Sequence, residues 1–153
     1  MATIWLAIPD DEKREYFEHD LPPILPGHTF EFAYMASALP DEGSPDAIVL
    51  DVGGMAGNFG NPHFSRLHTD YALRQYPSAT LLVLSAMGSY VAELVAQMHK
   101  EGLPVTHVVS SPEGVAYGLI ITGVVGAPPG WAEQVAEATK WGLLQPKVAD
   151  GDV

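Results

Sequence analysis

The chain has 153 residues, the size of one ordinary domain, and 47% of them are apolar, so one hydrophobic core is expected to form without a metal or a disulfide. Cysteine is absent, which excludes a disulfide framework, a thiolate zinc site and a cysteine nucleophile. The formal net charge of −12 disfavours direct binding to nucleic acid or to an anionic membrane, because both need clustered lysine and arginine, whereas it fits a cation site, a basic protein partner or solubility alone.

The first part of the chain predicts a strand followed by a helix. Residues 3–8 (TIWLAI) form a continuous apolar run, which is typical of a strand buried on both faces. Asp10 is a suitable helix cap, so a helix is expected to run to about residue 19 and to end at Leu21-Pro22-Pro23. The apolar run stops after six residues and acids follow, which argues against a signal peptide and favours a cytoplasmic protein.

Two further strands are expected before the middle of the chain. Residues 28–35 alternate between apolar and other side chains, which is typical of a half-covered strand at the edge of a sheet; the face expected to be covered carries Phe30, Phe32 and Tyr34. Residues 47–50 (AIVL) form another buried run that ends at Asp51. A glycine-rich loop, residues 53–60, comes next, and Asn61-Pro62 is a good start for a helix.

The second half continues the alternation of strands and helices. Strands are expected at residues 80–84 and 105–109, and helices are expected to start at Ser89, at Ser111-Pro112 and near residue 131. Residues 115–125 are ambiguous, because three glycines and several β-branched residues weaken a helix while the chain order favours one.

This order predicts an α/β fold with a parallel sheet between two layers of helices. A three-layer flavodoxin-like arrangement with five strands in the order 2-1-3-4-5 places the alternating strand at an edge and the continuous runs inside. We expect one domain overall, with an α/β body at residues 1–125 and a C-terminal helical extension with a loose tail at residues 126–153.

The most informative polar residues fall at the carboxyl ends of the expected strands. Asp10 and Asp11 follow the first strand, Asp51 ends the third and Ser85 ends the fourth. In this topology ligands gather at those ends. Three converging carboxylates would repel one another unless a cation lay between them, and Mg²⁺ prefers oxygen ligands of this kind. A magnesium site formed by Asp10, Asp11 and Asp51 is therefore a candidate.

With these residues in place, the sequence resembles the receiver domains of bacterial response regulators over about residues 3–125. Asp10-Asp11 matches the acidic pair of that family, Asp51 in IVLDVGGM matches the phosphoacceptor, and Ser85-Ala86 matches the Ser/Thr-Ala step. The resemblance implies that Asp51 accepts a phosphoryl group, that Ser85 contacts it and that Mg²⁺ binds the acids.

Two departures from the family pattern indicate a degenerate receiver. The family has a lysine before the proline that follows the fifth strand, whereas this chain has Ser110-Ser111-Pro112 there. The loop after Asp51 is also longer and lacks the family's Met-Pro-Gly step. A signalling or protein-binding domain with weak or absent phosphorylation of Asp51 is therefore favoured over an enzyme.

Other interpretations of the same residues stay open. Asp10 and Asp11 could serve only to cap the first helix, Asp51 could tie down the glycine-rich loop, and Ser85 could bond to nearby backbone. The chain would then be a flavodoxin-like interaction protein without chemistry. A third possibility is a small Mg²⁺-dependent phosphoryl-transfer or hydrolytic enzyme that uses the same three acids. The sequence specifies neither the partner nor the oligomeric state.

Overall fold

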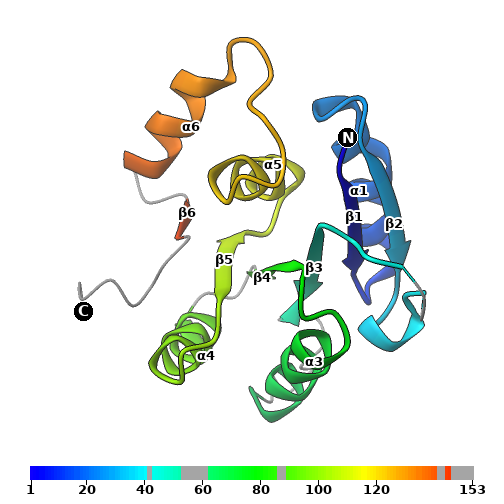
Figure 1. The fold of residues 1–153 in the computed structure, drawn as a ribbon, viewed down its shortest axis with the longest axis vertical. Coiled ribbons are helices and arrows are strands. Elements are labelled where there is room, and N and C mark those ends of the chain that lie inside the picture. The colour runs from blue at the N-terminus through cyan, green and yellow to red at the C-terminus, as the bar shows by residue number, and fades with distance from the viewer. Residues whose placement is uncertain (41–42, 53–61, 86–88, 141–143, 146–153) are drawn as a thin grey trace.

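A computed structural model of the chain describes residues 1–40, 43–52, 62–85, 89–140 and 144–145 (Figure 1). One sheet has the strand order β2-β1-β3-β4-β5-β6. The strands are β1 (Thr3–Ala7), β2 (Thr29–Ala33), β3 (Ala47–Asp51), β4 (Thr80–Ser85), β5 (Val105–Val109) and β6 (Leu144–Gln145). The first five pair in parallel, which confirms the order 2-1-3-4-5. The short β6 was not expected; it adds to β5 in the antiparallel direction.

Helices cover both faces of the sheet and confirm the three-layer α/β architecture (Figure 1). They are α1 (Asp11–Ile24), α3 (Pro62–Gln75), α4 (Ser89–Lys100), α5 (Pro112–Ile121) and α6 (Trp131–Lys140), with a short 3₁₀ turn, η1 (Ala36–Ala38). Helices α1 and α5 lie on one face, and α3 and α4 lie on the other. Helix α6 packs on the outside of α5. None of the helices in the described residues is long and apolar enough to cross a membrane.

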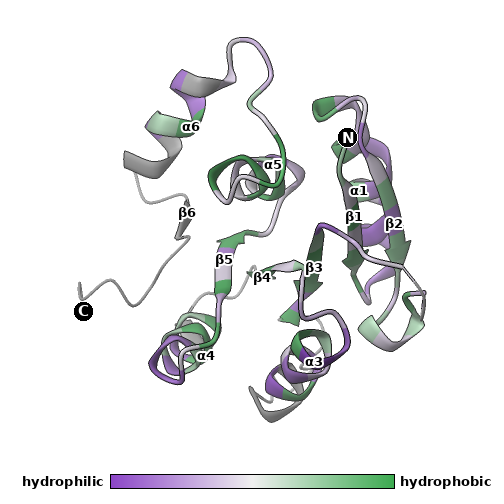
Figure 2. Ribbon diagram, in the orientation of Figure 1, coloured by the Kyte–Doolittle hydropathy of each residue, from purple (hydrophilic) through white to green (hydrophobic). Residues whose placement is uncertain are grey.

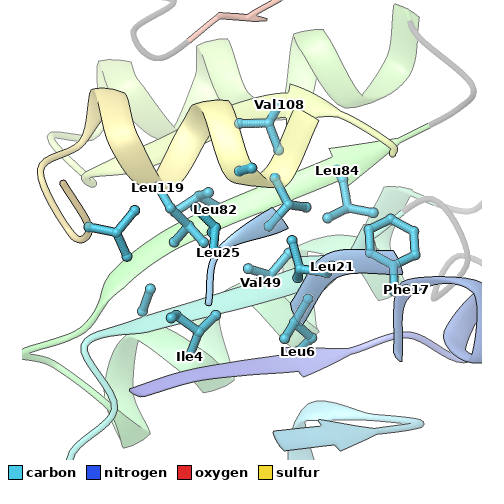
Figure 3. Close-up of a cluster of buried hydrophobic side chains, with 14 of the residues drawn as sticks. Ile4, Leu6, Phe17, Leu21, Leu25, Val49, Leu82, Leu84, Val108 and Leu119 are labelled. Atoms are coloured by element: carbon cyan, nitrogen blue, oxygen red, sulfur yellow. The ribbon is translucent and has the colours of Figure 1, made fainter. Parts of the chain in front are cut away.

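The core on the α1 and α5 side is built by strand alternation. Ile4 and Leu6 of β1 point to this side together with Val49 of β3, and they meet Phe17 and Leu21 of α1 (Figure 3). All five side chains are fully buried. Figure 2 shows the apolar residues on the strands and on α5, whereas the outer sides of α1, α3 and α4 are polar. The alternation explains why the continuous apolar runs belong to strands with both faces covered.

The opposite face has its own core under α3 and α4. Trp5 of β1 contacts Tyr76, just after α3, edge to face with ring centroids 5.5 Å apart. The Tyr76 hydroxyl donates a hydrogen bond to the Pro40 carbonyl at 2.9 Å. Helix α4 contributes an apolar stripe that is fully buried; its members are Val91, Val95 and Met98.

Helix α1 is longer than the sequence predicted. It runs to Ile24 and includes Pro22 and Pro23, which were expected to end it. Leu21 and Leu25 are buried at the spacing of four residues that begins at Phe17. Burying a leucine side chain contributes about 1.5–3 kcal/mol. This burial offsets the cost of the two prolines. That cost is limited because they lie in the last turn of the helix, where few helix hydrogen bonds remain to be disrupted.

Strand β2 confirms the expected edge position but ends earlier than predicted. Phe30 and Phe32 are half-buried against the core, as expected for the covered face. Tyr34 lies beyond the strand and is 57% exposed, so the prediction that it shares this covered face was wrong. The chain turns towards η1 directly after Ala33, and the alternation ends with the strand.

The ambiguous residues 115–125 begin in a helix, and their glycines explain how that helix packs. Helix α5 starts at the expected cap, where the Ser111 hydroxyl oxygen accepts a hydrogen bond from the Gly114 amide at 3.0 Å. A Cβ at Gly118 would lie 2.5 Å from Val108 Cγ1 and 2.8 Å from Leu82 Cδ2. A Cβ at Gly114 would overlap the carbonyl oxygen of Val109. These glycines weaken the helix in isolation but let it approach the sheet closely.

We therefore expect alanine at either glycine to destabilise the protein. Gly118→Ala should lower the free energy of unfolding by about 1–3 kcal/mol through overpacking, and Gly114→Ala by more, because backbone yields less than side chains. Gly126→Ala is the matched control, since a Cβ there meets no atom within 4 Å. Urea unfolding of the three variants measures the difference. Equal stabilities would mean that α5 does not sit this close to β5.

Candidate functional site

The candidate site lies at the carboxyl ends of the central strands. Asp51 is the last residue of β3, and its side chain is 2% exposed. It is in register with Leu84 of β4, so Ser85 follows one residue further along the neighbouring strand. The structure thus places Asp51 at the predicted strand end, and the backbone of Ser85 at the end of β4. The glycine-rich residues 53–60 and Ala86 lie outside the described residues.

Asp10 caps helix α1. Its carboxylate oxygen Oδ2 accepts a hydrogen bond from the Lys13 amide at 2.8 Å, which is the geometry of an N-cap. The capping role that the sequence left open for this residue is therefore present. An aspartate used in this way has one oxygen committed to the helix backbone.

Asp11 is directed to solvent rather than into the site. Its side chain is 83% exposed, and Oδ1 pairs with the Arg14 guanidinium at 2.6 Å. The same guanidinium donates a second hydrogen bond to the Ile8 carbonyl at 2.9 Å. Arg14 therefore ties Asp11 to the end of β1 and compensates its charge locally.

The residue that sequence reasoning missed is Lys13. Its Nζ lies 2.9 Å from Oδ2 of Asp51, and its side chain is only 24% exposed. The signal was present in the spacing, because Lys13 precedes Phe17 and Leu21 by four and eight residues. Residues four apart share one face of a helix, so Lys13 continues the stripe that faces the sheet. Its place among the charged residues of DDEKRE concealed this.

The three acids thus have separate partners. Asp10 bonds to helix backbone, Asp11 to Arg14, and Asp51 to Lys13. In the part of the chain that the structure describes, no group of three or more His, Asp or Glu residues could hold a metal ion. The chemical character of the site is that of a buried carboxylate with a half-buried ammonium group beside it.

The end of β5 is occupied by two serines with different roles. Ser111 caps α5, as described above. The hydroxyl oxygen of Ser110 is buried and has no hydrogen-bond partner within the described residues. No cation stands at this position in the sequence, so the positive charge beside Asp51 comes from the first helix rather than from the end of the fifth strand.

A second charged network braces α3 and α4. The Arg66 guanidinium bonds to Asp70 at 2.9 Å and to both carboxylate oxygens of Glu101, at 3.0 and 2.5 Å. The hydrogen bonds from Arg66 lower the pKa of Glu101 to about 2, and they raise the pKa of Arg66. Burial lowers the pKa of His68 on α3. This network of Arg66, Asp70 and Glu101 contains none of the predicted site residues.

The comparisons with known proteins bear on the fold. No family model and no curated protein matches the sequence. A solved structure of the RcsB response regulator of Salmonella typhimurium, described for its conformational dynamism in DNA interaction, superposes with a TM-score of 0.58 and 14% identity. The match covers 89% of this chain and 67% of that chain.

The fold is receiver-like, with the flavodoxin-like strand order 2-1-3-4-5. The five parallel strands and the two helical layers follow the arrangement that the resemblance implied. At 14% identity the likeness concerns the fold and carries no activity with it. The chemistry therefore has to be argued from the residues at the strand ends.

Proposed function

We propose that this chain is a receiver-like regulatory domain that binds a protein partner, and that Lys13 holds Asp51 in an internal ion pair. The observation that carries the proposal is the 2.9 Å contact between the two side chains at the carboxyl end of β3. Asp51 occupies the phosphoacceptor position of the receiver fold, but its charge is already compensated from within the chain. The domain therefore behaves as a binding module whose response to phosphoryl donors is blunted.

Two properties of Asp51 reduce its reactivity. Transfer from acetyl phosphate needs a carboxylate oxygen to attack phosphorus while the bond from phosphorus to the acetate oxygen breaks and acetate leaves. Asp51 is 2% exposed, and its Oδ2 forms an ion pair with the Lys13 ammonium group at 2.9 Å. An oxygen whose negative charge is compensated in this way is a weaker nucleophile. The lysine expected after β5, which would hold the product, is replaced by serine.

Mg²⁺ enters the proposal as a competitor of Lys13. Asp51 together with Asp10 or Asp11 could bind Mg²⁺ through one or two carboxylates and water, which is how this ion is usually held. Binding of Mg²⁺ would require two changes. Lys13 would have to leave Asp51, and Asp10 or Asp11 would have to give up its present partner. We therefore expect weak binding in the natural sequence and tighter binding when the ammonium group is removed.

The test measures phosphorylation and metal binding in the same variants. The natural sequence should show little or no mass increase after incubation with acetyl phosphate and Mg²⁺, and Mg²⁺ at about 10 mM should barely change its melting temperature. Lys13→Met should acquire a Mg²⁺-dependent rise in melting temperature, because a ligand that binds only the folded state stabilises it. Asp51→Asn added to Lys13→Met is the matched control and should remove that rise.

The outcomes separate the candidate functions. A stoichiometric, Asp51-dependent adduct on the natural sequence would show that the domain is an ordinary receiver. It would contradict the proposal that the ion pair with Lys13 prevents phosphorylation of Asp51. Continued turnover of the phosphoryl donor would favour the small enzyme instead. If Lys13→Met and the double variant Ser110→Lys/Lys13→Met respond neither to acetyl phosphate nor to Mg²⁺, the chain is best described as an interaction domain without chemistry.

The partner is proposed from charge. The N-terminal half of α1 has four exposed acidic side chains, which are Asp11, Glu12, Glu15 and Glu18. The aromatic ring of Tyr16 is exposed beside them. An acidic surface attracts a basic protein and raises its rate of encounter, with strong dependence on salt. The acidic face of α1 is therefore suited to a basic protein partner.

A further inference from the structure

We propose that Arg14 is a positioning residue that holds Asp11 away from Asp51, so that these two carboxylates do not share a divalent cation. The observation behind it is that one guanidinium group donates hydrogen bonds both to Oδ1 of Asp11, at 2.6 Å, and to the Ile8 carbonyl, at 2.9 Å. This role rests on the proposed function and deepens it, because it adds a second cation to the control of Mg²⁺ binding by Lys13.

The anchor of Arg14 is a carbonyl just beyond the end of the ladder between β1 and β2. At the start of that ladder the Thr29 amide donates to the Ala2 carbonyl at 2.9 Å, and at its end the Ile8 amide donates to the Ala33 carbonyl at 2.8 Å. A longer ladder would pair the Ile8 carbonyl with the amide two residues after Ala33, but β2 ends at Ala33. The guanidinium group takes that place, so Arg14 is fixed to the backbone of the sheet.

The exposure of the side chains shows that the two acids have different surroundings. Asp11 is 83% exposed, whereas Asp51 is 2% exposed. Arg14 lies between these extremes at 21%, and its planar guanidinium group is suited to bind two acceptors at fixed angles. A carboxylate held in this way has to give up a charge-assisted hydrogen bond before it can bind a metal ion. Arg14 therefore weakens any cation site that needs Asp11.

Two adjacent cations thus keep the acids apart. Lys13 pairs with Asp51, and Arg14 pairs with Asp11. Consecutive residues of a helix are about 100° apart around its axis, so Lys13 reaches the end of β3 while Arg14 reaches the turn after β1. Removal of Lys13 alone leaves Asp11 held by Arg14. The effect of Arg14 on Mg²⁺ should therefore be measured after Lys13 has been replaced.

The test measures the Mg²⁺ affinity of the full chain by isothermal calorimetry in the Lys13→Met background. Arg14→Met releases Asp11, and Asp11→Asn is made both with and without Arg14→Met. The matched control for charge is Arg74→Met, which removes an exposed cation from the last turn of α3. Circular dichroism confirms that each variant is folded. If Arg14→Met is not, Arg14→Gln replaces it, because the amide can still donate to the Ile8 carbonyl.

Arg14→Met should tighten Mg²⁺ binding at least about threefold, whereas Arg74→Met should change it less than about twofold. Asp11→Asn should weaken binding at least about threefold in the chain that carries Arg14→Met, and less than about twofold where Arg14 is present. Equal effects of Asp11→Asn in the two backgrounds would overturn the proposal, because Arg14 would then act through its charge alone.

Failure of this proposal and failure of the proposed function give different results. If Lys13→Met binds Mg²⁺ and the addition of Arg14→Met changes nothing, only the role of Arg14 is overturned. Binding that appears only in the double variant and depends on Asp11 would support that role and make Arg14 the main obstacle to Mg²⁺. Absence of binding in both variants would overturn it, while the proposed function would still be judged by the response of Asp51 to acetyl phosphate.

Discussion

Lys13→Met should lower the free energy of unfolding by about 2–4 kcal/mol. Removing one partner of a buried ion pair typically costs about 3–5 kcal/mol, because the remaining charge is left in a poorly solvated place. Asp51 is 2% exposed and would be that charge. The estimate is reduced because Lys13 is 24% exposed, so water already weakens the pair on its side.

A double-mutant cycle tests whether this cost comes from the pair. Asp51→Asn should cost less than Lys13→Met, because the ammonium group that remains can reach water. The double variant should be more stable than the sum of the single effects predicts, by about 1.5–3 kcal/mol. Asp11→Asn is the matched control, since it breaks an exposed pair with Arg14 and should change stability by at most about 1 kcal/mol. Strictly additive single effects would mean that Lys13 and Asp51 do not interact in solution.

The strand order could be predicted because burial on both faces leaves a clear pattern in sequence. Residues 3–8 and 47–50 are continuous apolar runs, and the structure places β1 and β3 inside the sheet. The alternating β2 lies at the edge, as half coverage requires. These features depend on local pattern alone, so the sequence was sufficient to assign them.

The ends of elements and their close packing were harder to predict. Pro22 and Pro23 are strong local signals for a helix end, but the buried Leu21 and Leu25 carry α1 past them. Gly118 weakens a helix by local propensity, yet its missing side chain is what lets α5 lie against Val108. In each case a tertiary contact outweighs the local preference, and such contacts cannot be read from neighbouring residues.

The candidate site was likewise predicted only in part from the sequence. Asp51 was placed correctly, because the end of a buried run fixes where its last residue lies. Its partner Lys13 was not predicted, because the neutralising group expected beside the acids was a metal ion. The helix phase set by Phe17 was the information needed, since a lysine one turn before a buried aromatic residue faces the same way.

Phe17→Ala should be among the most destabilising single substitutions in the chain, with a loss of about 3–5 kcal/mol. Phe17 is fully buried under the sheet in the same core cluster as Leu6 and Leu84 (Figure 3), so truncation leaves a cavity that rigid strands cannot close. Tyr16→Ala is the matched control, because the neighbouring ring is 46% exposed and its removal should cost far less. Chemical denaturation of both variants measures the difference.

The same substitution should weaken the ion pair above it. Phe17 fixes α1 on the sheet, and Lys13 reaches Asp51 from the preceding turn of that helix. If this packing positions Lys13, the coupling energy between Lys13 and Asp51 should fall when the cycle is repeated in the Phe17→Ala background, and Mg²⁺ should then stabilise a chain that still carries its lysine. An unchanged coupling energy would mean that the N-cap at Asp10 holds Lys13 in place by itself, and the placement of the ion pair would then depend on helix capping rather than on the core.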